Sequence, residues 1–198
     1  SIALARMQSI SDLLLRINTN LSILTPKLYD QLKTLKNVHW IVSAEATDQK
    51  FNYIRWPGKY STLVANIKKI QELPHKVTIN MTWNLLCAFN ILEFIDDMME
   101  NGVHPNQFVM NFVSDPIEQS VSNITKQQRD VLIVELKKRI DNTNNTFFLY
   151  KVYEEMIDIL NRPLLDTYRT ALYNTLMDLD KKRKLNSKEI FPELYNKD

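Results

Sequence analysis

Four short β-rich runs, separated by segments with helical patterns, limit the possible folds of this chain more than any other feature. The runs cover residues 13–18, 38–45, 76–83 and 107–113, and each is followed by polar or turn-forming residues. The first three runs then lead into amphipathic helix patterns. Because such alternation is typical of parallel sheets with right-handed crossovers, we expect an α/β fold with four parallel strands.

The segment after the first run carries signals for the start of a helix. Thr25 is a favoured N-cap residue, and Pro26 is favoured at the first helical position. Three leucines follow at helical spacing. We expect Leu28, Leu32 and Leu35 to point into the core.

The next two connections also contain helix patterns. Apolar residues recur at helical spacing over residues 60–73, and Pro74 ends the pattern. A third helix is predicted over residues 89–101, with Gly102 as its C-terminal cap. Residues 46–52, which follow the second run, are expected to form a polar loop.

The number of strands is too small for a closed barrel of ordinary size. We therefore expect residues 1–116 to form a partial (β/α) barrel, with further strands supplied by sequence upstream of Ser1. The first residues favour this interpretation, because they lack an initiator Met and resemble the end of a helix that runs into a strand.

The pattern changes after the fourth run. Residues 125–128 (Thr-Lys-Gln-Gln) have the form of a capping box. From there to Leu179 the chain is predicted to be mostly helical, with breaks near residues 142–145 and 162–163. We assign residues 117–198 to a helical C-terminal segment.

Charge and cysteine content argue against several classes of function. The net charge is +2, so no general electrostatic attraction to nucleic acid or to a membrane surface is implied. No basic stripe with interleaved aromatic residues is visible, and no apolar run approaches the roughly 18 residues of a membrane span. The single cysteine, Cys87, cannot form an internal disulfide, which fits a reducing, cytoplasmic compartment.

Polar residues follow each of the four runs, and ligands of parallel α/β proteins bind beyond the carboxyl ends of the strands. Arg55 is the nearest obvious cation, and its planar guanidinium suits a carboxylate or a phosphate. The alternative is that these residues only cap helices and tighten turns. The polar residues in question are Asn18, Thr19 and Asn20, then Ser43, Glu45 and Thr47, then Trp83 and Asn84, and finally Asn111, Ser114 and Asp115.

Structural roles are favoured for the other chemically versatile residues. The histidines at positions 39, 75 and 104 share no metal-ligand spacing. Cys87 lies at a helix start, where its pKa could be lowered, but the role of a small buried residue is favoured. Trp56 is the exception, because it lies next to the candidate arginine in the same loop.

Several short sequence motifs together resemble radical S-adenosylmethionine proteins, most closely the phage-type and environmental members with a twitch-like extension. Ser43-x-Glu45-Ala46, followed by Tyr53-Ile54-Arg55 and a Gly-Lys-aromatic entry into a helix, resembles the fourth βα unit of that family. Residues 17–20 (INTN) resemble the end of its third strand, and residues 77–102 resemble its fifth unit. Residues 179–194, which contain Phe-Pro-Glu-Leu, resemble the end of such proteins.

The resemblance implies a partial (β/α)6 barrel in which S-adenosylmethionine lies across the strand ends and chelates a [4Fe–4S] cluster held by a CxxxCxxC loop. Chemistry in the family begins with reductive cleavage of this cofactor to a 5′-deoxyadenosyl radical. Ser43 matches a position that contacts the methionyl or ribose part of the cofactor, and Arg55 matches one that faces a carboxylate or the substrate. The candidate cofactor-binding residues are Ser43, Glu45, Arg55 and Asn84, and no catalytic residue or metal ligand is assigned.

The chain also departs from the family pattern. It contains no CxxxCxxC and no Gly-Gly-Glu-Pro, and Glu45-Ala46 stands where many members have Asp-Gly. Because a cluster needs about three or four thiolates, the chain as given is not expected to initiate radical chemistry. We expect the C-terminal portion of a radical S-adenosylmethionine enzyme that acts on a small-molecule or peptide substrate, with a missing N-terminal part that holds the cluster.

A non-catalytic α/β scaffold or protein-interaction module is the alternative. An open half-barrel leaves an unpaired strand edge, through which the chain could form a homodimer. Enzymatic activity therefore stays open, and neither nucleic acid nor a membrane is an expected partner.

Overall fold

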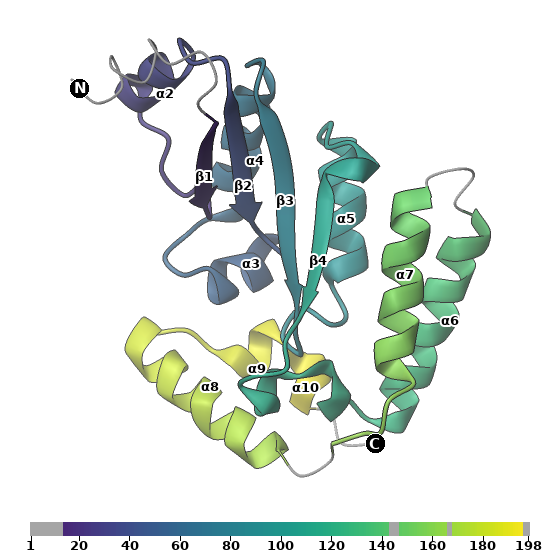
Figure 1. Ribbon diagram of the computed structural model, residues 1–198. Coiled ribbons are helices and arrows are strands. Elements are labelled where there is room, and N and C mark those ends of the chain that lie inside the picture. The colour runs from purple at the N-terminus through teal and green to yellow at the C-terminus, as the bar shows by residue number, and fades with distance from the viewer. Residues whose placement is uncertain (1–13, 143–146, 166–167, 196–198) are drawn as a thin grey trace.

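A four-stranded parallel sheet forms the centre of the computed structural model, which describes residues 14–142, 147–165 and 168–195. The spatial order of the strands is β1-β2-β3-β4, and all three neighbouring pairs are parallel (Figure 1). This confirms the predicted four parallel strands, with boundaries that differ by one or two residues. The strands are β1 (Leu15–Thr19), β2 (Val38–Ser43), β3 (Lys76–Trp83) and β4 (Phe108–Phe112).

Helices connect the strands, as the alternating pattern predicts. In Figure 1, α4 and α5 lie behind the sheet, whereas α3 lies below it, next to the carboxyl ends of the strands. The connecting elements are α2 (Pro26–Leu32), α3 (Asp48–Ile54), α4 (Tyr60–Gln71), α5 (Ile91–Glu100) and the short 3-10 helix η1 (Pro105–Gln107).

The start of α2 agrees with its prediction, but one of its leucines does not. The Thr25 hydroxyl accepts a hydrogen bond from the Leu28 amide at 3.2 Å, and Pro26 is the first helical residue. Leu32 and Leu35 are buried, whereas Leu28 is 36% exposed. The prediction for Leu28 was wrong because α2 has only seven residues and buries Leu32 alone.

Helix α3 occupies the place of the predicted polar loop, so that prediction was wrong. Phe51 and Tyr53 are both buried, and their apolar contacts stabilise this short helix. A helix of seven residues spans about two turns. This length is too short for the helical period to stand out among polar neighbours.

The end of α5 has the form that Gly102 predicts. Gly102 has a φ of +88°, a conformation that L side chains rarely adopt. Its amide donates to the Met99 carbonyl at 3.0 Å, and the Val103 amide donates to the Met98 carbonyl at 3.0 Å. These two bonds form a Schellman motif, and the accompanying apolar residues, Met98 and Val103, are both buried.

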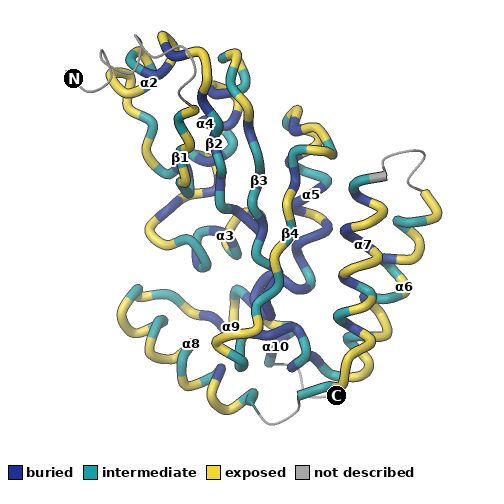
Figure 2. Tube along the Cα trace, in the orientation of Figure 1, coloured by how far each residue is buried: buried dark blue, intermediate teal, exposed yellow. Residues whose placement is uncertain are grey.

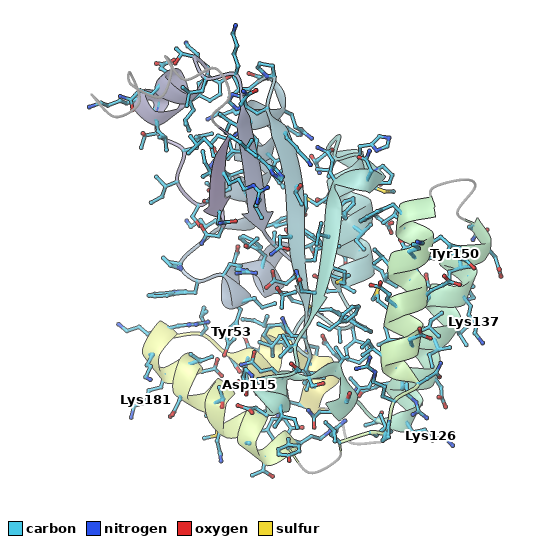
Figure 3. The ribbon with its side chains drawn as sticks, in the orientation of Figure 1. Tyr53, Asp115, Lys126, Lys137, Tyr150 and Lys181 are labelled. Carbon is cyan, nitrogen blue, oxygen red and sulfur yellow. The ribbon has the colours of Figure 1, made fainter. Side chains whose placement is uncertain are left out.

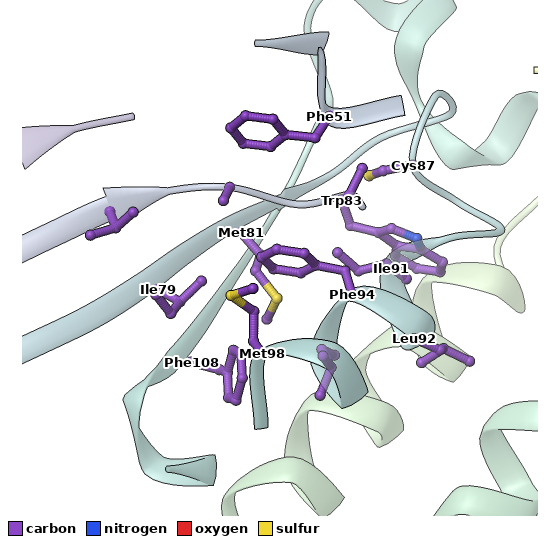
Figure 4. Close-up of a cluster of buried hydrophobic side chains, with 14 of the residues drawn as sticks. Phe51, Ile79, Met81, Trp83, Cys87, Ile91, Leu92, Phe94, Met98 and Phe108 are labelled. Carbon is purple, nitrogen blue, oxygen red and sulfur yellow. The ribbon is translucent and has the colours of Figure 1, made fainter. Parts of the chain in front are cut away.

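The main core lies between the sheet and the helices behind it. Ile79 and Met81 of β3 pack toward Phe94 and Met98 of α5 (Figure 4), and all four side chains are buried. Burial alternates along the strands (Figure 2), so that one residue in two faces these helices. Cys87 is also buried in this region, as expected for a small apolar residue.

A helical C-terminal region follows the sheet, as predicted. The Thr125 and Gln128 side chains each accept from the other's backbone amide, at 3.1 and 2.9 Å, which confirms the capping box. The predicted break at residues 162–163 separates α7 from α8, whereas most of the break at 142–145 lies outside the described residues. The elements are η2 (Ile117–Gln119), η3 (Val121–Asn123), α6 (Lys126–Asn142), α7 (Phe147–Leu160), α8 (Arg169–Arg183), α9 (Ser187–Ile190) and α10 (Pro192–Tyr195).

The C-terminal helices pack against the sheet region in two places. Helices α6 and α7 lie beside α5 (Figure 1), and Arg139 donates two hydrogen bonds of 2.6 Å to the Asp96 carboxylate of α5. Helices α8, α9 and α10 lie beneath the carboxyl ends of the strands. Within the part of the chain that the structure describes, no helix combines the length and the apolar character needed to cross a bilayer.

Candidate functional site

One face of the sheet is polar, and we call it the polar face. Its side chains alternate along the strands with those that face α4 and α5, and the strand register places them in neighbouring rows. All of them are exposed or half-buried. The polar face consists of Arg16 and Asn18 of β1, His39, Ile41 and Ser43 of β2, Lys76, Thr78, Asn80 and Thr82 of β3, and Val109 and Asn111 of β4.

An open polar face is unusual for a parallel sheet. Parallel sheets occur almost only with both faces covered, and their strands are therefore apolar on both sides. Here α4 and α5 lie on one side, and none of the described helices crosses the other side in Figure 1. Asn, Ser and Thr side chains offer hydrogen-bond donors and acceptors, so the polar face is suited to a polar ligand rather than to a second apolar layer.

Hydrogen bonds link side chains across the polar face. His39 Nε2 and Thr78 Oγ1 lie 2.8 Å apart, and Asn111 Nδ2 donates to Asn80 Oδ1 at 2.8 Å. The Asn80 Nδ2 donors and the Asn111 Oδ1 acceptor have no protein partner among the described residues. Burial, followed by the charges of Lys76 and Arg16, lowers the pKa of His39, which favours its neutral form.

Ser43 lies on the polar face, at the carboxyl end of the second strand. It is the last residue of β2 and pairs in register with Asn80 of β3. The face therefore brings Ser43 close to the Asn80–Asn111 pair. Its contact with a cofactor stays a prediction.

Glu45 and Arg55 form an ion pair just beyond the carboxyl end of β2. Arg55 donates from Nε and Nη2 to Glu45 Oε2, at 3.1 and 2.6 Å. Burial raises the pKa of Glu45, and the Arg55 guanidinium opposes that rise. Arg55 already donates to the Glu45 carboxylate. To bind a ligand carboxylate as predicted, its guanidinium would have to contact Glu45 and the ligand at the same time.

Asn84 uses its side chain within its own turn. Its Oδ1 accepts from the Leu86 amide at 2.9 Å, and its Nδ2 donates to the Thr82 carbonyl at 2.9 Å. These contacts match the turn-forming alternative, and a contact of Asn84 with a cofactor stays a prediction. Thr19 and Asn20 likewise accept from the amides two residues later, at 2.9 and 3.2 Å.

The sequence analysis missed the mid-strand part of the polar face. Thr78, Asn80 and Thr82 alternate with Val77, Ile79, Met81 and Trp83 in the run KVTINMTW. That strict alternation was a signal for a strand with one polar face. The prediction covered only residues beyond the strand ends, because ligands of parallel α/β proteins usually bind there.

The histidines outside the polar face make structural contacts. His75 Nδ1 accepts from Trp40 Nε1 at 3.1 Å, and His104 accepts from the Asn106 amide at the start of η1. Within the described ranges, no three His, Cys, Asp or Glu side chains form a group that could hold a metal ion. Burial raises the pKa of the Cys87 thiol, so this residue does not fit the thiolate ligand that a [4Fe–4S] cluster needs.

A hydrogen-bond cluster around Asp180 joins the C-terminal helices to α3. Asp180 accepts from the Tyr53 hydroxyl at 2.8 Å, and from the amide and hydroxyl of Ser187 at 2.9 and 2.7 Å. Arg183 Nη1 donates to the Tyr53 carbonyl at 2.6 Å. This Asp180 cluster fixes the end of α3, the helix that leads directly into Arg55.

A groove of about 1070 Å³ lies between α5 and α6, away from the polar face. Phe89 and Leu92 line it from the α5 side, and Val131 and Val134 line it from α6. The two valines are exposed, and the ion pair of Asp96 with Arg139 also borders the groove. The polar face is open, whereas this groove has a partly apolar lining.

Comparisons with known proteins do not assign a family. No protein-family model, no curated protein and no solved structure matched the chain. The resemblance to radical S-adenosylmethionine proteins therefore stays a prediction from the sequence, and function has to be argued from the site.

Proposed function

We propose that the chain forms half of the barrel of a radical S-adenosylmethionine enzyme, with the polar face as the inner wall that contacts cofactor and substrate. The observation that supports this most strongly is the polar face itself. A parallel sheet covered on one side only, with amides and hydroxyls on the other, is what the wall of a barrel around a hydrophilic ligand requires.

The chemistry of the polar face fits S-adenosylmethionine. This cofactor carries an amino acid, a ribose and an adenine, all of which need hydrogen-bond donors and acceptors. Asn80 Nδ2 and Asn111 Oδ1 have no protein partner among the described residues, and Ser43 lies beside Asn80 in register. In the proposal these three residues bind and orient the cofactor.

The iron–sulfur cluster does not fit the residues present. The 198 residues contain one cysteine, and that cysteine is fully buried. In the proposal the cluster ligands come from sequence outside the given chain, and the role of this chain is to bind and position.

The strand edges agree with the proposed barrel. In the described part of the chain, β1 pairs only with β2, and β4 pairs only with β3. Further strands could therefore extend the sheet at either edge. The substrate of such an enzyme would be a small molecule or a peptide that reaches the polar face.

Isothermal titration of the chain with S-adenosylmethionine tests the proposal. Saturable binding is expected in about the millimolar range, which corresponds to roughly 4 kcal/mol, because the cluster contact is absent. The double variant Asn80→Ala with Asn111→Ala should lose this binding, whereas Asn174→Ala, on the exposed surface of α8, should retain it. Absence of binding by the unmodified chain, or equal loss in both variants, would overturn the proposal.

A second candidate is a non-catalytic scaffold that pairs through a strand edge. The same one-sided pairing of β1 and β4 favours it, since unpaired edges can pair with another chain. Light scattering after size exclusion separates the candidates. A stable dimer without cofactor binding supports the scaffold, and a monomer that binds the cofactor contradicts it.

A further inference from the structure

Trp56 is exposed at the carboxyl end of the sheet, unlike the other two tryptophans. Its side chain is 52% exposed, whereas Trp40 and Trp83 are 2% and 0% exposed. It lies in the turn after α3, next to Arg55. A large aromatic side chain with an open surface calls for an explanation, because its burial would stabilise the fold.

The fold places Arg183 of α8 against Trp56, although the two are far apart in the sequence. The Arg183 guanidinium lies 5.8 Å from the centroid of the Trp56 ring and 5.5 Å from that of Tyr53. One of its nitrogens donates to the Tyr53 carbonyl. Arg183 has no carboxylate partner among the described residues, so its remaining donors can serve a ligand.

Further cations precede and follow Arg183 in the sequence, and the Asp180 carboxylate of the same helix is engaged. Lys181, Lys182 and Lys184 are exposed around Arg183 at the end of α8, and Figure 3 shows Lys181 at the same end of the molecule as Tyr53. Asp180 accepts hydrogen bonds from Tyr53 and Ser187. The corner formed by Trp56 and residues 181–184 therefore combines an open aromatic surface with an excess of positive charge.

We propose that this corner binds a free nucleotide, with the base stacked on Trp56 and the phosphate held by Arg183 and Lys184. Aromatic side chains stack on nucleotide bases, and the planar guanidinium of arginine pairs with phosphate through two hydrogen bonds. An acidic peptide would use the cations but would leave the exposed part of the Trp56 indole uncovered.

The distribution of charge favours a short ligand over a nucleic acid strand. The net charge of the chain is only +2, and the cations at this corner belong to one helix end rather than to a long track. Binding to a strand usually depends on a positively charged groove that follows the backbone over several nucleotides. The few cations at this helix end are enough to bind one phosphate group.

Nucleotide binding at this corner is independent of the proposed function. Only the interpretation of the nucleotide as a substrate rests on the proposed function. Trp56 adjoins Arg55, whose partner Glu45 follows β2, so a bound nucleotide would lie near the carboxyl end of β2. The binding itself involves none of the side chains assigned to the cofactor.

Tryptophan fluorescence tests the inference directly, because only Trp56 has a substantially exposed side chain. The chain is titrated with guanosine 5′-monophosphate, and emission at the red edge is followed. Saturable quenching is expected, with guanosine and inorganic phosphate each binding at least about fivefold more weakly, since each lacks one of the two contacts.

Matched variants locate the site. Arg183→Gln and Lys184→Gln should each weaken binding of guanosine 5′-monophosphate by about fivefold or more. Lys137→Gln removes the same charge from the exposed surface of α6, on the other side of the molecule in Figure 3, and should leave binding unchanged. If Arg183→Gln disturbs the contact with Tyr53, Lys184→Gln still tests the site, because it leaves that contact in place.

Three results would overturn the inference. One is no saturable quenching at about 10 mM nucleotide, well above the millimolar affinities at which weak sites are detected. Another is equal weakening by Lys137→Gln. The third is binding of a single-stranded oligonucleotide without binding of the free nucleotide. Because Arg183→Gln should not affect S-adenosylmethionine binding, loss of one ligand with retention of the other shows which proposal has failed.

Discussion

At the scale of single residues, the ion pair between Glu45 and Arg55 is asymmetric. The Glu45 side chain is 2% exposed, whereas that of Arg55 is 26% exposed. An unpaired charge costs most where water cannot reach it. The two partners should therefore differ in what their removal does to stability.

Replacement of the cation should be the more damaging change. Arg55→Met leaves the buried Glu45 carboxylate without a partner, and we expect the free energy of unfolding to fall by about 3 kcal/mol at pH 7. Glu45→Gln leaves a partly hydrated guanidinium and should cost less. Urea denaturation measures both. Asp30→Asn, which removes one partner of the exposed Lys33–Asp30 pair, is the control and should cost under about 1 kcal/mol.

The same pair predicts a pH dependence. Burial raises the pKa of Glu45 even with Arg55 present, and without Arg55 the rise should be larger. A carboxyl whose folded-state pKa is raised stabilises the fold at low pH, and that contribution is lost as the pH rises through the folded-state pKa. The free energy of unfolding of Arg55→Met should therefore be furthest below that of the double variant Arg55→Met with Glu45→Gln near pH 7. The two free energies should approach each other as the pH is lowered. A difference that grows as the pH falls would contradict this account.

Cys87 should react slowly in the native protein. Its thiol is buried, and burial raises its pKa, so that little thiolate forms and reagents have no access. We expect a disulfide reagent such as dithionitrobenzoate to modify Cys87 at pH 8 only after denaturant is added. Rapid stoichiometric reaction of the folded chain would show that the core around Cys87 opens.

At the scale of helices and strands, the Asp180 cluster holds the C-terminal helices on α3. Three hydrogen bonds of 2.7 to 2.9 Å converge on this carboxylate. Edge contact between the Tyr53 and Phe191 rings, whose centroids lie 5.1 Å apart, adds apolar packing. The four-residue helix α9 also contacts α3, α8 and α10.

Removal of this carboxylate should loosen α9 and α3 together. We expect Asp180→Ala to lower the free energy of unfolding by about 2 kcal/mol, because several donors lose their partner. Hydrogen exchange should speed up in both helices but not in β3. Asp178→Ala changes an exposed residue of the same helix. It should leave the free energy of unfolding within about 0.5 kcal/mol of that of the unmodified chain, and the exchange rates of α3 and α9 unchanged. Faster exchange in α9 alone would show that α3 does not depend on the cluster.

The length of each helix or strand decides whether it could be predicted from the sequence. The runs that became β2 and β3, and the pattern that became α4, are long enough to show their period, and capping residues such as Thr25 marked helix starts correctly. Helix α3 was missed because seven residues give too few repeats. Leu28 was assigned to the core because spacing alone does not show where a short helix lies at the edge of a fold.

At the scale of the whole molecule, the sheet separates an apolar core from the polar face. The order of the strands could be predicted, since consecutive parallel units usually lie side by side. The approach of α8 to Trp56 could not, because Arg183 comes from another part of the chain and only tertiary packing brings it there. The side-chain contacts that engage Arg55 and Asn84 were likewise invisible in the sequence.

Chemical-shift mapping tests the central claim, that the polar face is a ligand-binding wall, most directly. S-adenosylmethionine is added to the isotope-labelled chain, and backbone amide shifts are recorded. We predict that the shifts gather at Asn18, Ser43, Asn80 and Asn111, and that they disappear in the double variant Asn80→Ala with Asn111→Ala. Shifts confined to the groove between α5 and α6, or no shifts at about 10 mM ligand, far above a millimolar dissociation constant, would contradict it.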